Sequence, residues 1–209
     1  MFFIQQRLAG GGTDLLVLNE GAAPMELKRR AIEGVFVCGR KFPPELQASD
    51  WMPRVQVTAT RSLEYVDTIR MDLEDAGRQA AGAILRSGRK EICLLGADGP
   101  EKKVSQKLFA ETRRHLPTIL NVHETFGNVG EIYATARKWL SLTRRTPGFV
   151  VSGFYLCSGA LIRAAEAESR SIGGDVLLLA FGTNNVVFED LVPISVLRVN
   201  RQEMADCAL

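Results

Sequence analysis

The stretch GFVVSGFYLCSGALIRAAEAESRSIGGDVLLLAF, residues 148–181, decides the fold class of this chain. It begins with the β-branched and aromatic run Phe149–Val151 and ends with the longer apolar run Val176–Phe181. Both runs are too apolar for a strand with one wet face, which favours buried strands of a parallel sheet. Between them, alanines and leucines recur at helical spacing, with Arg163 and Glu166 on the other side. The stretch therefore predicts a strand, a crossover helix and a second parallel strand, with right-handed topology.

The carboxyl ends of these two strands are the first place to look for a binding site. The first strand is followed by Ser152–Tyr155 and the second by Gly182–Asn185. In open parallel sheets, ligands bind outside the carboxyl ends because loops and helix N-termini gather there. We therefore expect both segments to contribute to a ligand site.

The composition is that of a globular protein without a strong overall field. The chain has 209 residues, 46% of them hydrophobic, which is enough for one large domain or two small lobes. Its 26 basic and 24 acidic residues leave a net charge of +2. Such a balance does not attract nucleic acid or an anionic membrane, so this chain alone does not resemble a DNA-binding module.

The cysteines and the N-terminus indicate a reducing compartment. The four cysteines are far apart, lie among apolar neighbours and form no CxxC pair, which favours packed thiols over disulfides or metal ligands. The apolar start has no basic region before it and no long hydrophobic segment, so we expect no signal peptide. No stretch approaches the roughly 18 apolar residues of a membrane span. We expect a cytoplasmic protein without a membrane partner.

Strand and helix patterns alternate along the chain, which is typical of an α/β protein. Asp72 precedes a helical pattern that reaches about Arg86, and an aspartate there can cap free N–H groups. The loop Gly96–Pro100 is rich in glycine and proline and predicts a division between two lobes near residue 98. Beyond it we expect a helix at 102–115, a strand at 118–122, a helix at 128–142, the quoted stretch, and a final extended run at 193–199.

The sequence contains no pattern that indicates catalysis, a metal or a cofactor. No cysteine or carboxylate lies at metal-ligand spacing from His115 or His123. The chain has no G-x-S-x-G or H-E-x-x-H motif, and the loop Gly96–Gly99 does not satisfy the dinucleotide-binding fingerprint. Ser158 falls inside a predicted helix without a nearby base. These observations favour a binding protein over an α/β enzyme.

Several segments, taken in order, resemble the LacI-type transcriptional regulators. The segment Gly77–Pro100 is similar to a helix of that family that ends in a basic turn before a strand. Ser158–Leu161 and Gly174–Val176 are similar to its Gly-Ala-Leu helix and the strand that follows. Pro193–Ala208 is similar to its final run from a proline through Glu-Met to an alanine. The matches cover most of residues 66–209.

The resemblance implies an α/β fold of the periplasmic-binding-protein-like type I, in which two Rossmann-like lobes with parallel sheets enclose a small-molecule effector. Residues 1–97, joined by 198–209, would form the N-terminal lobe, and 98–197 the C-terminal lobe. Such regulators are typically homodimers that bind operator DNA through a separate helix-turn-helix headpiece. We expect this headpiece to be missing here, so that the chain is a fragment. The alternative is a secreted solute-binding receptor for transport or chemotaxis.

Departures from the family pattern affect the polar groups that hold an effector. An Asn-Asp pair of the family is Gly153-Phe154 here, and an aspartate after the next strand is replaced by Gly182. An arginine of the first helix in the C-terminal lobe has only Lys107 nearby. Each buried ligand group left unpaired loses roughly 1 to 3 kcal/mol, so a sugar-like or nucleoside-like effector needs other partners.

Aromatic residues are the candidates to replace these polar groups. Phe126, Phe154 and Tyr155 either line the cleft and stack on a ring or pack in the core of the lobe. Thr183 and Asn184 can supply hydrogen bonds at the strand end. The full set of predicted ligand-binding residues is Arg40, Asp72, Asp98, Lys107, Phe126, Phe154, Tyr155, Gly182, Thr183 and Asn184.

Overall fold

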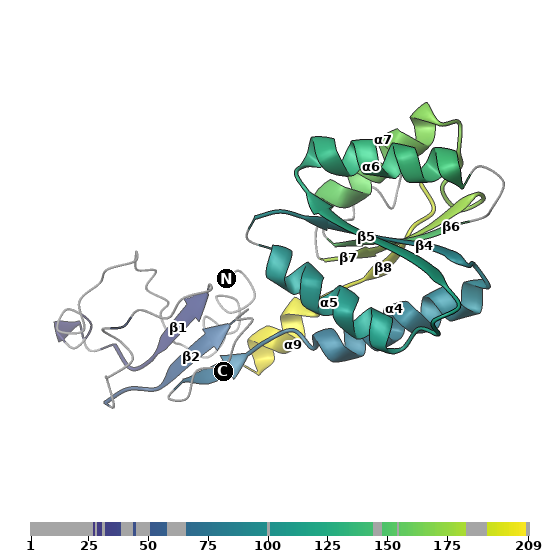
Figure 1. Ribbon diagram of the computed structural model, residues 1–209. Helices are drawn as coiled ribbons and strands as arrows, with labels where there is room; N and C mark the ends of the chain where they lie inside the picture. The colour runs from purple at the N-terminus through teal and green to yellow at the C-terminus, as the bar shows by residue number, and fades with distance from the viewer. Residues whose placement is uncertain are drawn as a thin grey trace. The chain divides into compact units, whose positions relative to one another are not determined.

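The computed structural model describes residues 27, 29–30, 32–38, 44, 51–57, 66–99, 101–143, 148–153, 155–182 and 192–207. The chain divides into two compact units (Figure 1). Unit 1 comprises Met1–Met71 and Asn200–Leu209, and unit 2 comprises Asp72–Val199.

Unit 1 contains a small parallel sheet. Its strands are β1 (Val35–Cys38), β2 (Arg54–Val57) and β3 (Asp67–Ile69), hydrogen-bonded in the order β1-β2-β3. The helix α9 (Arg201–Asp206) returns to this unit from the end of the chain, and its Ala205 is buried in a cluster with Val57. The return of the last residues to the first unit was expected from the resemblance.

Unit 2 is a five-stranded parallel sheet with helices on both faces. The strands follow the order β5-β4-β6-β7-β8, with α4 and α5 on one face and α6 and α7 on the other (Figure 1). The elements are α4 (Leu73–Ser87), β4 (Glu91–Ala97), α5 (Lys102–Arg114), β5 (Asn121–Gly127), α6 (Val129–Leu142), β6 (Gly148–Gly153), α7 (Tyr155–Ala167), β7 (Val176–Phe181) and β8 (Ser195–Leu197). The predicted α/β class with parallel sheets is confirmed.

The stretch at 148–181 forms the predicted unit β6-α7-β7. Its strands pair in parallel, with Gly148 opposite Val176 and Gly153 opposite Phe181. Every residue of β6 is buried, as a strand with helices on both faces requires. The small side chains of Ala160 and Ala164 are buried on the inner face of α7, which allows the helix to pack closely on the sheet.

The structure divides the chain earlier than the sequence suggested. Lobes of 1–97 and 98–197 were expected, but β4 lies between β5 and β6 and pairs with both. Residues 72–97 therefore belong to unit 2, and unit 1 ends at Met71. The glycine-rich segment after β4 is the turn that leads into α5, and a tight strand-to-helix turn requires the same residue types as a linker.

One strand is displaced from its expected position. A strand was expected at 118–122, and β5 runs from Asn121 to Gly127. It is an edge strand of the described sheet, and most of its side chains are exposed or half-buried, so its sequence has none of the apolar continuity of the central strands.

Among the described residues, no helix is long and apolar enough to cross a membrane.

Candidate functional site

The candidate ligand site lies at the carboxyl edge of the five-stranded sheet. The chain leaves β4 to one side to form β5 and then returns to form β6 on the other side. The point between β4 and β6 is thus the topological switch point, where open α/β sheets bind ligands. Helices α5, α6 and α7 each begin just after a strand at this edge.

Two glycines face each other at the switch point. Gly96 of β4 pairs with Gly153 of β6. A Cβ atom on Gly96 would lie 2.2 Å from Cε1 of Phe126, and one on Gly153 would lie 2.3 Å from Oγ of Ser105. The absence of side chains at these positions therefore lets Phe126 and Ser105 lie directly over the ends of the central strands.

Ser105 is the polar group of the site that lacks a partner. It lies in the first turn of α5, is 0% exposed, and its Oγ has no hydrogen-bond partner among the described residues. A buried hydroxyl in this state costs about 1–3 kcal/mol, so proteins keep few of them without a reason. The nearby pair Ser152 and Ser158 differs, because their Oγ atoms lie 2.6 Å apart and satisfy each other.

A cation, a carboxylate and an aromatic ring lie beside these residues. The Nζ atom of Lys102 is 2.6 Å from Oδ1 of Asp98 and 5.7 Å from the centre of the Phe126 ring. The Phe126 ring also packs on Phe109, with 5.6 Å between ring centres. The amide of Asp98 donates to the carbonyl of Gly127 at 2.9 Å, which ties the ends of β4 and β5 together. Lys102 and Asp98 are both half-exposed and can exchange their mutual contact for a ligand.

The predicted site residues fall into three groups. Asp98, Phe126 and Gly182 lie at this edge, where Gly182 has a φ of 127° and donates its amide to the carbonyl of Leu197. Tyr155 begins α7 at the same edge, and its side chain lies outside the described set. Arg40, Phe154, Thr183 and Asn184 also lie outside the described residues.

Asp72 and Lys107 have other positions. The Asp72 side chain accepts a hydrogen bond from the amide of Asp75 at 2.9 Å and thereby caps α4. Lys107 is exposed, and its position about 200° around α5 from Ser105 directs it away from the buried face. The structure therefore does not bring Lys107 to the site.

Sequence reasoning missed Lys102 and Ser105. The signal for Ser105 was the register of α5, in which Val104, Leu108 and Thr112 are buried and place residue 105 on the inner face. A serine in a helix does not by itself indicate a function. Its meaning depends on the strand residue that it packs against, here Gly153.

The thiols near the site are poor nucleophiles. Burial raises the pKa of Cys157 to about 12, and the negative charge of Glu101 acts in the same direction. Burial alone raises the pKa of Cys93 to about 12. Both remain protonated at neutral pH. No group of three or more histidine, cysteine or carboxylate side chains within the described ranges is arranged to hold a metal ion.

Comparison with known proteins finds relatives by structure and none by sequence. No protein-family model matches the sequence. No curated protein matches it either.

Solved structures of transcriptional regulators are similar over nearly the whole chain. A LacI-family regulator from Rhizobium etli matches 99% of this chain and 81% of its own, with a TM-score of 0.76 and 18% identity. The chain has the fold of these regulators. The Cra dual regulator from Pseudomonas putida, in complex with fructose 1-phosphate, covers 99% of this chain and 82% of its own, with a TM-score of 0.70 and 20% identity. A LacI-family regulator from Lactobacillus casei with bound glucose matches 99% of this chain and 83% of its own, with a TM-score of 0.66 and 16% identity. The fold implied by the sequence resemblance is thus confirmed.

Proposed function

We propose that this chain is the effector-sensing part of a LacI-like transcriptional regulator and binds a small molecule at the carboxyl edge of its five-stranded sheet. The observation that carries the proposal is the buried Ser105 hydroxyl at the switch point, which has no partner among the described residues. The similarity in fold to transcriptional regulators supports the same function and favours it over a secreted solute-binding receptor.

The chemistry of the edge fits a ring that carries hydroxyl groups. The Ser105 hydroxyl can both donate and accept a hydrogen bond, and the Lys102 ammonium can bind an oxygen or a phosphate. The face of Phe126 offers an apolar surface for a sugar or a base. A sugar-like or nucleoside-like effector therefore suits these residues, and two regulators of similar fold hold fructose 1-phosphate and glucose.

The effector acts on DNA indirectly in this proposal. A separate helix-turn-helix segment binds the operator, and the effector shifts a homodimer between states of different affinity for DNA. The near balance of basic and acidic residues fits a sensing part that does not itself bind DNA.

A thermal-shift screen tests the proposal. Sugars, sugar phosphates and nucleosides are added to the purified chain, and a ligand at 100 times its Kd stabilises the folded state by about 2.7 kcal/mol, which raises Tm by several degrees. Replacement of Ser105 by Ala should weaken this shift and leave the Tm of the free protein equal or slightly higher, because the lost hydroxyl has no partner among the described residues.

Ser141→Ala is the matched control. Ser141 lies on an exposed face of α6, where its Oγ donates a hydrogen bond to the carbonyl of Lys138. It is in the last turn of this helix, whereas the carboxyl edge of the sheet is at the first turn. The control should leave the ligand shift unchanged. A screen in which no compound of any class raises Tm would contradict the proposal.

A further inference from the structure

The turn between β5 and α6 connects the first turn of α6 to the candidate site through one peptide unit. The carbonyl of Gly127 accepts a hydrogen bond from the amide of Asp98 at 2.9 Å. The N–H of the same peptide unit belongs to Asn128 and donates to Oε2 of Glu131 at 2.8 Å. Because a peptide unit is planar, its C=O and N–H rotate together, and a rotation that breaks one bond also weakens the other. Asp98 and Glu131 therefore hold opposite sides of one rigid plane.

The bond to Glu131 also strengthens the bond from Asp98. A carboxylate forms stronger hydrogen bonds than a neutral acceptor, and hydrogen bonds in a chain polarise one another. The carboxylate of Glu131 polarises the N–H of Asn128, which increases the negative partial charge on the oxygen at the other side of the peptide unit. That oxygen is the acceptor for Asp98. One side chain of α6 thus acts on the end of β4.

Gly127 leaves the space that this arrangement needs. A Cβ atom on Gly127 would lie 2.7 Å from Oε2 of Glu131 and 2.9 Å from its Cβ. The carboxylate is the end of a flexible side chain and could move, whereas the Cβ is attached directly to the helix backbone. A side chain at position 127 would therefore displace the carboxylate from the amide of Asn128.

Asp98 carries this support into the candidate site. Its carboxylate is 2.6 Å from Nζ of Lys102, and that ammonium lies 5.7 Å from the centre of the Phe126 ring. Gly99 follows with a φ of 106°, and a Cβ atom on it would meet nothing within 4 Å. The bond to Gly127 therefore restrains the backbone of Asp98 at a turn where close packing is absent.

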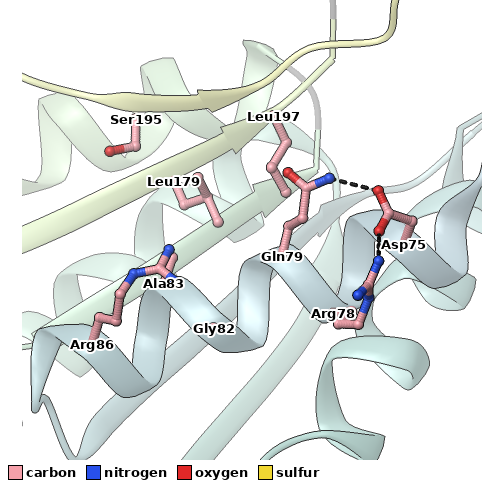
Figure 2. Close-up of a pocket in the computed structure, with 9 residues that line it drawn as sticks. All are labelled: Asp75, Arg78, Gln79, Gly82, Ala83, Arg86, Leu179, Ser195 and Leu197. Atoms are coloured by element: carbon pink, nitrogen blue, oxygen red, sulfur yellow. Dashed lines mark hydrogen bonds and ion pairs between the residues drawn. The ribbon is translucent and has the colours of Figure 1, made fainter.

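The acidic residue at the same position of α4 has no such role. Asp75 follows the N-cap residue of α4 by three positions, as Glu131 does in α6. Its carboxylate binds Gln79 at 2.6 Å and also Arg78, both in its own helix (Figure 2). It lines an open groove between α4 and the strands β7 and β8, together with Gly82. The bond from an N-cap amide to an acidic side chain is thus a particular feature of the turn between β5 and α6.

We propose that Glu131 is a positioning residue of the candidate site. Its carboxylate holds the peptide unit of Gly127 and Asn128, and this unit holds the backbone of Asp98. The carboxylate of Asp98 is then in place before a ligand binds. This role rests on the proposed function, because a group that is already ordered lowers the cost of binding. The alternative is a capping box that only stabilises the first turn of α6.

Hydrogen exchange at the amide of Asp98, measured by NMR on the full chain, tests this role without a ligand. Glu131→Ala removes the charged acceptor and should accelerate this exchange about tenfold, because the bond to the peptide unit of Gly127 is weakened. The amide of Leu94 is the internal reference. Leu94 is fully buried in the middle of β4, and its exchange should change much less.

Asn128→Ala separates positioning from capping. It removes the side-chain oxygen that accepts from the amide of Glu131 at 3.1 Å, so α6 loses its N-cap. It keeps the backbone N–H that the Glu131 carboxylate binds. The exchange of Asp98 relative to Leu94 should therefore stay as in the parent chain.

Two further variants act on the same bond. Glu131→Gln keeps an acceptor for the amide of Asn128 and should restore most of the protection at Asp98. Gly127→Ala should resemble Glu131→Ala, because the added Cβ atom displaces the carboxylate.

Glu203→Ala is the matched control. In α9, Glu203 also follows an asparagine N-cap by three positions, but its carboxylate accepts from the side chain of Asn200 at 3.1 Å. α9 belongs to unit 1. This control should leave the exchange of Asp98 unchanged.

Ligand affinity distinguishes this role from the proposed function itself. Glucose, glucose 6-phosphate and adenosine are titrated into the chain by calorimetry, as probes of three effector classes. A probe that binds the parent chain should bind Glu131→Ala about tenfold more weakly, because Asp98 must then be ordered on binding. Asn128→Ala should bind the same probe with an unchanged Kd.

Three results would overturn the positioning role and leave Glu131 as a helix cap. One is equal acceleration at Asp98 and Leu94 in Glu131→Ala, and another is the same selective acceleration in Asn128→Ala. The third is an unchanged Kd in Glu131→Ala for a probe that binds the parent chain. If no probe binds the parent chain, the proposed function fails, and the exchange of Asp98 still decides whether Glu131 holds this backbone.

Discussion

The two buried cysteines illustrate how position changes the chemistry of a side chain. Cys93 lies in the central strand β4 and Cys157 in the first turn of α7, and both belong to the main hydrophobic core of unit 2. The exposed Cys207 lies just after α9. Because a thiolate is charged and burial opposes charge, the two core thiols stay protonated.

This burial predicts a loss of stability at alkaline pH. The pKa of Cys93 is raised from 9.0 to about 12 in the folded state, so the unfolded chain releases the proton first. The contribution is fully present below pH 9 and is lost as pH rises from 9 toward 12, by about 1 kcal/mol per thiol between pH 9 and 10. Urea unfolding at several pH values measures this slope, which Cys93→Ala should reduce.

Cys207→Ala is the control for the alkaline slope, because this thiol is exposed in the folded protein. The same slope in the parent chain and in Cys93→Ala would contradict the assignment. Alkylation by iodoacetamide at pH 8 provides a second readout. It should modify Cys207 in the folded protein, and it should reach Cys93 and Cys157 only after denaturation.

At the scale of elements, α4 contains two glycines with opposite roles. Gly77 faces α5, and a Cβ atom there would lie 2.9 Å from the backbone nitrogen of Thr112. Gly82 faces the groove, and its nearest neighbour is the flexible end of Arg86. The first glycine therefore lets two helices approach closely, and the second leaves the groove open.

This contrast predicts opposite effects of the same substitution. Gly77→Ala should lower the free energy of unfolding by about 1–3 kcal/mol, because the backbone of α5 must move. Gly82→Ala should raise it by about 0.5–1 kcal/mol, because alanine favours the helix and the end of Arg86 can shift. Urea unfolding of both variants measures the difference. Equal effects of the same sign would show that α4 and α5 are packed too loosely at Gly77 for a Cβ atom to displace the backbone of α5.

The elements that could be predicted from the sequence are those whose environment is uniform along their length. The strands β6 and β7 are nearly continuous apolar runs because helices cover both of their faces. α4 was predicted from Asp72, which does cap it. The edge strand β5 was misplaced because its polar side chains lack any alternation that would mark its limits.

The sequence predicts where the candidate site would lie more readily than which residues would form it. The rule that ligands gather at carboxyl ends of parallel strands points to the edge where Asp98 and Phe126 lie. Ser105 was missed because its significance comes from Gly153, a residue far away in sequence and opposite it in space. Lys107 was chosen because it is near in sequence to the place of a family arginine, and the helix register directs it to solvent.

At the scale of the whole molecule, the division of the chain follows strand pairing. β4 is an interior strand of unit 2, and its backbone pairs with β5 on one side and β6 on the other. A glycine- and proline-rich segment follows it, and such a segment looks the same in sequence whether it joins domains or only turns the chain. Long-range pairing, which local composition does not record, decides between the two.

This topology predicts which fragment folds alone. Residues 72–199 contain the whole five-stranded sheet, its four covering helices and their core, so this fragment should unfold in one cooperative transition. Residues 98–197, the lobe suggested by the sequence, lack α4 and β4. Without the strand between them, β5 and β6 have no pairing partner in common, and the core loses Cys93 and Leu95.

Circular dichroism and urea unfolding of the two fragments measure the difference. The 72–199 fragment should show a sharp transition and near-ultraviolet signals of packed aromatic side chains, and 98–197 should show neither. The reason is the large loss of buried surface when a central strand is removed, which side-chain rearrangement at the exposed edges of β5 and β6 cannot replace. Cooperative unfolding of 98–197 with a similar midpoint would mean that β4 contributes little and that the division near residue 98 is the physical one.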